Sequence, residues 1–167
     1  VPAEMLVGEE NAGWRLITTQ LNHERVMLGP AGKIAGIYDR VHAWASKPRG
    51  NGVTPVDQDD VKRSLGEIHS IWRVNELFNW QVASSGDTAD AAATKVFSTE
   101  RIQRIGRLAE EIVAKYGNPA EGETAELLKW LDSHTKRNLV ITFGGGVNEV
   151  MREQVAAAGL KVPRVPR

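Results

Sequence analysis

The stretch DDVKRSLGEIHSIWRVNELFNWQVAS, residues 59–84, decides the fold class. Its apolar positions are Val61, Leu65, Ile68, Ile71, Trp72, Leu77 and Phe78. They recur at the three- and four-residue spacing of one helix face. The two aspartates that open the stretch stand where the dipole of a helix favours negative charge. A long helix with one apolar face needs other helices to cover it, so the stretch predicts one member of a helical bundle.

Helical patterns also flank this stretch. Residues 10–45 predict one helix, although Gly29-Pro30 should kink it because proline lacks a backbone donor. A loop rich in glycine and proline follows at residues 46–58. Further helices are expected at 89–116, at 124–136 and after the glycines at 144–146, with an extended tail from 161. The fold class is therefore all-α, an antiparallel bundle of four to five helices.

Composition excludes several kinds of function. The 167 residues suit one domain, and 21 basic residues balance 21 acidic ones, which argues against a nucleic-acid or membrane-surface binder. The chain has no cysteine, so disulfides, thiolate catalysis and cysteine-ligated metals are excluded, and its four histidines lack metal-site spacing. Because no leader pattern or long apolar run is found, a soluble cytoplasmic protein is expected.

Glu24 is the residue whose position is most informative. Ile17, Leu21, Glu24 and Leu28 are spaced 4, 3 and 4 apart, which puts the carboxylate on the apolar stripe of the first helix. A carboxylate in apolar surroundings has a raised pKa, as a base for a weakly acidic C–H needs. A salt bridge to a neighbouring helix, or a place at the edge of the stripe, explains the spacing equally well. Arg25 points about 100° away, so it does not neutralise Glu24 on the same face.

Gly144-Gly145-Gly146 is a second signal. Backbone amides without side chains at a helix start can bind an anion or let a flat ligand approach closely. The run is not a dinucleotide fingerprint, because the GxGxxG spacing and a preceding βα unit are both missing. A flexible turn is the simpler explanation of the run by itself.

Two segments resemble the acyl-CoA dehydrogenase family. VPAEMLVGEENAGWRLITTQLNHERVMLGPAG, residues 1–32, is similar to the passage from the middle β-domain into the C-terminal helical domain. ITFGGGVNEVMREQVAAAGLKVPR, residues 141–164, resembles the closing motif of that domain. The resemblance implies that residues 1–167 are the C-terminal helical domain, without the N-terminal helical and middle β-domains. An opening Val-Pro without methionine also leads us to expect a fragment.

The resemblance implies FAD-dependent α,β-dehydrogenation of an acyl-CoA, with a glutamate that removes the α-proton. In most members this glutamate lies in the closing motif, where Gly145 stands in this sequence. A minority carry the base on the first helix of the domain, immediately before an arginine, and Glu24-Arg25 match that pair. Glu24 is thus the expected catalytic base, and Arg25 is expected to contact the acyl-CoA.

The same resemblance implies which residues lie at the flavin. The positions that match residues near the flavin are Gly145, Gly146, Val147 and Glu149. Arg49 stands near, but out of register with, the position of the family arginine that binds the FAD diphosphate of a neighbouring subunit. The loop RGNGVTP departs from the family pattern, as does Glu111-Ile112-Val113-Ala114-Lys115, which replaces a glutamine followed by a glycine pair.

With these departures, the sequence resembles actinobacterial acyl-CoA dehydrogenases that form α2β2 heterotetramers and act in steroid side-chain degradation. The expected partners are an acyl-CoA, a same-family subunit in a homo- or heterotetramer, and electron-transfer flavoprotein or a similar acceptor. The substrate is a fatty or a bulky steroid acyl-CoA. The alternative is a non-catalytic helical subunit that completes the FAD site of its neighbour.

Overall fold

The computed structural model describes residues 2–27, 29–50 and 52–163. These residues form no strand, and their six α-helices are α1 (Gly13–Met27), α2 (Ala31–Ala45), α3 (Asp59–Ser85), α4 (Thr88–Tyr116), α5 (Gly122–Leu139) and α6 (Asn148–Gln154). Short 3-10 turns stand at η1 (Ala3–Met5), η2 (Pro55–Asp57) and η3 (Val140–Thr142), and α6 continues into a π-helical turn, η4 (Val155–Gly159). The all-α bundle predicted from the sequence is confirmed.

The bundle is built around α4. This helix packs against α2, α3 and α5 along its length, and against α1 and α6 near its start. The core contains fully buried side chains from each of the four long helices, among them Ile37, Ile68, Ile105 and Leu131. Gly106 allows the close approach of α4 to α5, because a Cβ there would come within 2.6 Å of the Thr135 hydroxyl. The buried face of α4 thus forms the centre of the molecule.

The connections follow their local sequence. Gly86 ends α3 with a left-handed φ of 61°, and Asp87 caps α4 by accepting hydrogen bonds from Ala89 N at 2.7 Å and Asp90 N at 3.1 Å. Leu77, predicted to be buried on α3, is 67% exposed, whereas Asn75 is fully buried. The prediction for Leu77 was wrong because the C-terminal half of α3 packs a polar side chain against the break between α1 and α2.

The single helix predicted for residues 10–45 was also wrong, since α1 and α2 are separate helices. Pro30 precedes α2 with φ −69° and ψ 131°, a backbone conformation outside the helical region. The tail is not extended throughout, because Lys161 has a left-handed φ of 57°. Residues 164–167 of the predicted tail lie outside the described residues.

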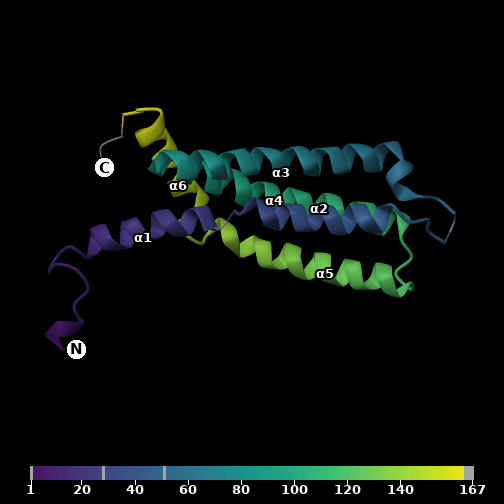
Figure 1. Ribbon diagram of the computed structural model, residues 1–167, viewed down its shortest axis with the longest axis horizontal. Helices are drawn as coiled ribbons and strands as arrows, with labels where there is room; N and C mark the ends of the chain where they lie inside the picture. Colours follow the sequence, from purple (N-terminus) through teal and green to yellow (C-terminus); the bar gives the residue numbers. More distant parts are fainter. Residues whose placement is uncertain (1, 28, 51, 164–167) are drawn as a thin grey trace.

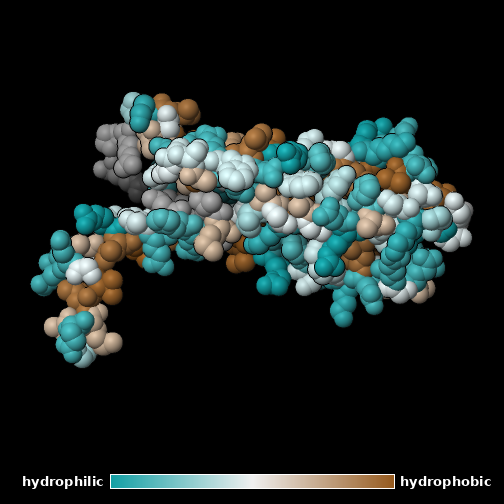
Figure 2. All heavy atoms as spheres, in the orientation of Figure 1, coloured by the Kyte–Doolittle hydropathy of each residue, from teal (hydrophilic) through white to brown (hydrophobic). Residues whose placement is uncertain are grey.

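Figure 1 shows that α1 projects beyond the end of the bundle where α6 lies, with the N-terminal segment at its tip. Residues 46–58 connect α2 to α3 at the opposite end. In Figure 2, apolar surface gathers on the N-terminal segment, where Met5, Leu6 and Val7 are all exposed. Across the described ranges, no helix combines the length and apolar character that crossing a membrane requires.

Candidate functional site

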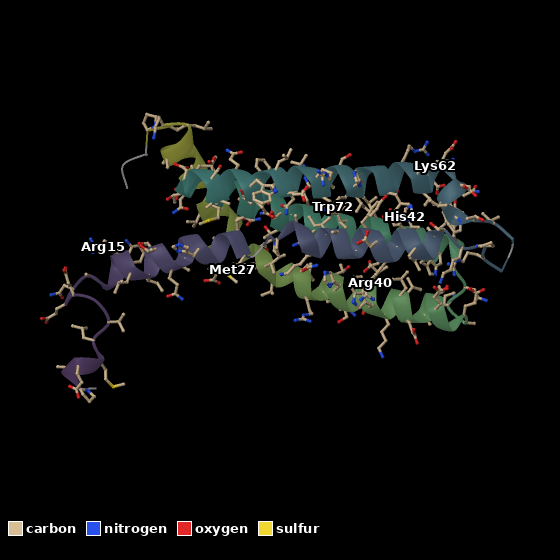
Figure 3. All side chains as sticks on the ribbon, in the orientation of Figure 1. Arg15, Met27, Arg40, His42, Lys62 and Trp72 are labelled. Carbon is tan, nitrogen blue, oxygen red and sulfur yellow. The ribbon has the colours of Figure 1, made fainter. Side chains whose placement is uncertain are left out.

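Glu24 lies in the last turns of α1, and its side chain is exposed. The apolar stripe predicted around it is only partly covered, since Ile17 is 42% exposed and Leu21 is half-buried. Figure 3 shows α1, with Arg15 and Met27 near its two ends, extending away from the body of the bundle. The described part of this chain therefore leaves the Glu24 side chain uncovered. Leu28 and the Arg25 side chain lie outside the described residues.

Two asparagines of α3 hold the break that follows α1. Asn75 donates to the Gly29 carbonyl at 2.7 Å, and Asn79 donates to the same oxygen at 3.3 Å. Asn79 also accepts a hydrogen bond from the backbone N–H of Ala31 at 3.0 Å. On its other side, Asn75 accepts a hydrogen bond from the Ser98 hydroxyl of α4. These bonds satisfy backbone groups that the helix break leaves without helical partners, so they fix where α1 leaves the bundle.

The glycine run forms a tight turn between η3 and α6. Gly145 has a φ of 65° and Gly146 a φ of 104°, both in the region that side chains disfavour. Gly145 is buried, whereas Phe143 is 68% exposed. The run is therefore needed for its backbone conformation, and a glutamate at position 145 would be strained in this turn.

Lys95 of α4 binds this turn from inside the molecule. Its side chain is fully buried, and its Nζ donates to the Thr142 carbonyl at 2.8 Å, the Gly146 carbonyl at 2.7 Å and the Asn148 Oδ1 at 2.6 Å. Three acceptors match the three N–H donors of an ammonium group. One side chain of α4 thus connects the turn to the start of α6.

A surface pair continues this cluster. Asn148 donates to Glu100 Oε1 at 3.1 Å, and Arg152 of α6 donates to the same oxygen at 2.6 Å. Burial raises the pKa of the Glu100 carboxyl, but the hydrogen bonds from Arg152 and Asn148 outweigh it and leave that pKa below its ordinary value. Glu100 is therefore an anion that holds α6 against α4.

The first helix and the glycine turn meet on one stretch of α4. Gly29 packs against Ser98, and a Cβ added at Gly29 would overlap the Ser98 side chain. Lys95, which binds the turn, is three residues earlier on α4, about one helical turn away. The structure thus places the two regions singled out in the sequence next to each other, although more than a hundred residues separate them in the chain.

Arg49 lies elsewhere, near the far end of α4. Its guanidinium stacks on Trp44 with 4.1 Å between Cζ and the ring centroid, donates to the Trp44 carbonyl, and pairs with Glu123 at 3.3 Å. Trp44 in turn donates to Thr124 at 3.2 Å, close to the end of α4 at Tyr116. The 21 positions of α4 from Lys95 to Tyr116 span about 30 Å at 1.5 Å per residue. Arg49 and the glycine turn therefore do not belong to one site of this chain.

The remaining predicted flavin positions lie on the outer side of the turn. Val147 is half-buried and Glu149 is exposed in the first turn of α6. Leu139, Val140 and Phe143, which lead into the turn, are each more than half exposed. An uncovered apolar strip beside glycines without side chains fits a flat aromatic ring such as that of a flavin. The exposed residues beside the turn are thus compatible with the group that the sequence predicted, whereas Gly145 itself is buried.

Sequence reasoning missed Lys95 and Asn75. Both are polar side chains on the inward face of a long helix, and each is fully buried. Lys95 stands between Ala92 and Thr99 at helical spacing, so a charged residue in a small-residue stripe was the available signal. Its two backbone partners, the carbonyls of Thr142 and Gly146, carry no such signal, because backbone carbonyls are the same in every sequence.

The chain is similar to known proteins in sequence and in fold. The sequence model described as "Acyl-CoA dehydrogenase, C-terminal domain" matches residues 11–160. The whole chain is 79% identical to the acyl-CoA dehydrogenase FadE29 and 38% identical to the acyl-CoA dehydrogenase FadE26, both of Mycobacterium tuberculosis. It covers 44% of each relative, so it spans less than half of their length.

Similar solved structures are complexes of two proteins. A chain of the ChsE4–ChsE5 complex from Mycobacterium tuberculosis matches with a TM-score of 0.83 and 36% identity, over 99% of this chain and 44% of that one. A chain of the Tcur3481–Tcur3483 steroid ACAD matches with a TM-score of 0.81 and 35% identity, over the same shares of the two chains. In each comparison the shared part is the helical bundle described above.

Proposed function

This chain belongs to the acyl-CoA dehydrogenase family, whose C-terminal domain matches residues 11–160, and we propose that it carries the catalytic base of a two-subunit enzyme for bulky acyl-CoA substrates. The observation that carries the proposal is the convergence of α1, which bears Glu24, and the glycine turn on the same stretch of α4. The proposal concerns the complete enzyme, of which this chain supplies the helical part.

Glu24 is proposed to take the α-proton of the thioester. Its carboxylate stands on α1 a few residues before the junction held by Asn75 and Asn79, so the helix that presents it is anchored at its C-terminal end. At the position where most family members have the base, Gly145 has a left-handed φ and no side chain. The exposed carboxylate is open to a substrate bound against α1, and parts of the enzyme outside this chain would complete its surroundings.

FAD is the proposed cofactor, held against the exposed side of residues 143–149. Gly145, Gly146, Val147 and Glu149 would line it, and the uncovered Leu139, Val140 and Phe143 would contact its rings. A bound flavin supplies the acceptor for the hydride that leaves the β-carbon. Glu24 removes the α-proton, so that the electrons of the α-C–H bond form the double bond. Arg25 follows Glu24 on α1 and is proposed to bind the acyl-CoA.

Arg49 stays a proposed contact to the flavin of a neighbouring subunit. Its guanidinium is engaged by Trp44 and Glu123 within this chain, so a diphosphate would have to share or replace the Glu123 contact. Lys115, in the segment that departs from the family pattern, pairs with Asp60 at 2.6 Å. These contacts support a division of labour in which a second, same-family subunit provides part of the FAD site.

The similar solved structures support the proposed subunit arrangement and substrate class. One is a complex of two different proteins, and another is called a steroid ACAD. We therefore propose a heterotetramer that acts on a steroid side-chain or similarly bulky acyl-CoA and passes electrons to electron-transfer flavoprotein or a similar acceptor.

The test of the base is the Glu24→Gln variant of the complete enzyme. Under anaerobic conditions, a panel of steroid and fatty acyl-CoAs should bleach the flavin of the wild type. The variant should bind FAD but bleach at least 10²-fold more slowly, in line with the loss of a general base. Glu126→Gln is the matched control, because Glu126 is an exposed glutamate of α5 to which no role in catalysis or cofactor binding is assigned.

If the flavin of the Glu24→Gln variant bleaches at the wild-type rate, Glu24 is not the catalytic base. In that case the alternative gains support, namely a non-catalytic subunit that completes the FAD site of its partner. The exposure of Glu24 in this chain favours that alternative, and its place on the anchored α1 favours catalysis.

A further inference from the structure

We propose that Lys95 is the positioning residue of the glycine turn. It holds residues 142–146 in one conformation and thereby sets the surface that faces the flavin. Only the statement that the turn faces a flavin rests on the proposed function. The contacts of Lys95 with the turn lie within this chain and do not depend on it.

Lys95 binds both ends of the turn with one atom. The carbonyls of Thr142 and Gly146 are four residues apart in the chain, and both accept hydrogen bonds from the same Nζ, at 2.8 and 2.7 Å. Between them lie Gly144 and Gly145, which have little conformational preference of their own. A backbone of this kind needs an outside group to select one conformation, and the buried ammonium supplies it.

The third bond of Lys95 extends the constraint to α6. Asn148, the first residue of α6, accepts from Nζ at 2.6 Å and donates to Thr99 at 3.2 Å and to Glu100 at 3.1 Å. Thr99 is one helical turn after Lys95 on the same face of α4. The start of α6 is therefore fixed in relation to the turn, and Val147 is held between two anchored residues.

The burial of this lysine is itself an argument for a role. Moving an ammonium group out of water costs several kcal/mol, so it is found in the interior only where its hydrogen bonds are met. A methionine of similar length would fill the same space without that cost. The charge is useful at this place because charged hydrogen bonds to two carbonyls are stronger than the neutral bonds otherwise available to the turn.

Lys95 lies one helical turn from the residue of α4 that supports the break between α1 and α2. Ser98, three residues later on α4, packs against Gly29 and donates to Asn75 at the α1–α2 break. The turn proposed to face the flavin and the helix proposed to present Glu24 thus share one rigid support. A change at Lys95 should move the turn without moving α1, because Ser98 and Asn75 hold the break separately.

The experiment compares Lys95→Met with the wild type in the complete enzyme. Lys136→Met is the matched control, since Lys136 is an exposed lysine of α5 that pairs only with Asp132 four residues earlier among the described contacts. Hydrogen exchange of the backbone amides in residues 143–150 is measured first. We expect exchange at least tenfold faster in Lys95→Met, unchanged exchange in α2 and α5, and wild-type behaviour of the control.

The visible spectrum and reduction potential of the bound flavin are measured on the same samples. A shift of both in Lys95→Met, together with faster exchange, supports the whole inference. Faster exchange with an unchanged flavin leaves Lys95 as the residue that positions the turn, but overturns the proposal that the turn faces FAD. Unchanged exchange in residues 143–150 overturns the role of Lys95 whatever the flavin does.

A second variant keeps the inference testable if Lys95→Met does not fold. Asn148→Ala keeps the lysine and removes the side-chain oxygen that accepts one of its hydrogen bonds. It should accelerate exchange in the same residues by a smaller factor. Wild-type exchange in Asn148→Ala would then contradict the inference.

Discussion

At the scale of single residues, the charged groups around the glycine turn have matched partners, whether they are buried, as Lys95 is, or exposed, as Glu100 is. Lys95 has three acceptors, and the anion Glu100 is bound by Arg152 and Asn148. His134 of α5 differs from these residues, because its surroundings disfavour its charged form. Its ring stacks on Trp130 at 4.9 Å, and the guanidinium of Arg40 lies 4.5 Å from the same Trp130 ring. Partial burial, followed by the positive charges of Lys33, Arg137 and Arg40, lowers the pKa of His134.

His134 should therefore make the stability of the protein depend on pH. Above the ordinary histidine pKa of about 6.5 the ring is neutral in both the folded and the unfolded chain. As the pH falls below that value, the unfolded chain binds the proton more readily, and the folded state loses stability until the lower folded pKa is passed. Replacing His134 by Phe keeps an aromatic ring that can stack on Trp130 and removes the group that binds the proton.

The measurement is the melting temperature of wild type and His134→Phe from pH 7.5 down to pH 5. The melting temperature of the wild type should fall more between these pH values than that of the variant. The difference should appear only below about pH 6.5. Equal losses in the two proteins would show that His134 does not contribute to the pH dependence.

At the scale of elements, the junction between α1 and α2 is the feature that links the core to the site. Pro30 prevents a continuous helix, and the polar atoms freed by the break bind Asn75 and Asn79 of α3. Gly29 is buried at the point where the chain touches Ser98 of α4. The direction in which α1 leaves the bundle is therefore set by three side chains of α3 and α4, and not by α1 itself.

Gly29→Ala should destabilise the protein by about 1–3 kcal/mol, because the added Cβ overlaps the Ser98 side chain in a packed interior. Gly32→Ala is the control. A Cβ at Gly32, in the first turns of α2, meets no atom within 4 Å, so this change should stabilise the helix by about 0.5–1 kcal/mol.

Denaturant unfolding of the two variants and the wild type measures both effects. Equal stability of Gly29→Ala and the wild type would mean that the junction adapts without cost, and that Asn75 and Asn79 do not hold one geometry.

At the scale of the whole molecule, one end of the bundle is left apolar. Leu77 and Trp80 of α3 are 67% and 70% exposed, and Val140 and Phe143 near the glycine turn are 66% and 68% exposed. Large exposed apolar areas in soluble proteins mark interaction surfaces. This end also carries the proposed flavin and base positions, so the surface and the site would be completed together by other parts of the enzyme.

The whole-molecule prediction concerns assembly. Co-expressed with its same-family partner, the complete subunit should form a particle of two copies of each, measured by native mass spectrometry, with fewer flavins than subunits. A homotetramer of this subunit with one flavin per chain would contradict the division of labour. The control is the partner expressed without this subunit, which should lack acyl-CoA-dependent bleaching of flavin.

The sequence by itself determined the helices and the class of the fold. The apolar spacing in residues 59–84 predicted α3 nearly to the residue, and the helix expected at 89–116 matches α4, because helix periodicity and the signals that end a helix are local properties. The motifs at both ends of the chain also led to the family, and the matching family model confirmed it. The break at Gly29-Pro30 was visible as a kink, but its two separate helices were not.

Only the tertiary structure decided what the polar residues do. Lys95 and Asn75 bind backbone carbonyls of segments at least 46 residues away, and no pattern in the chain marks those carbonyls as their partners. Arg49, placed near the flavin by motif, is held by Trp44 and Glu123 because the end of α2 and the start of α5 lie side by side. Local periodicity fixes which face of a helix is apolar, whereas the partner of a buried donor depends on which segments the whole fold brings together.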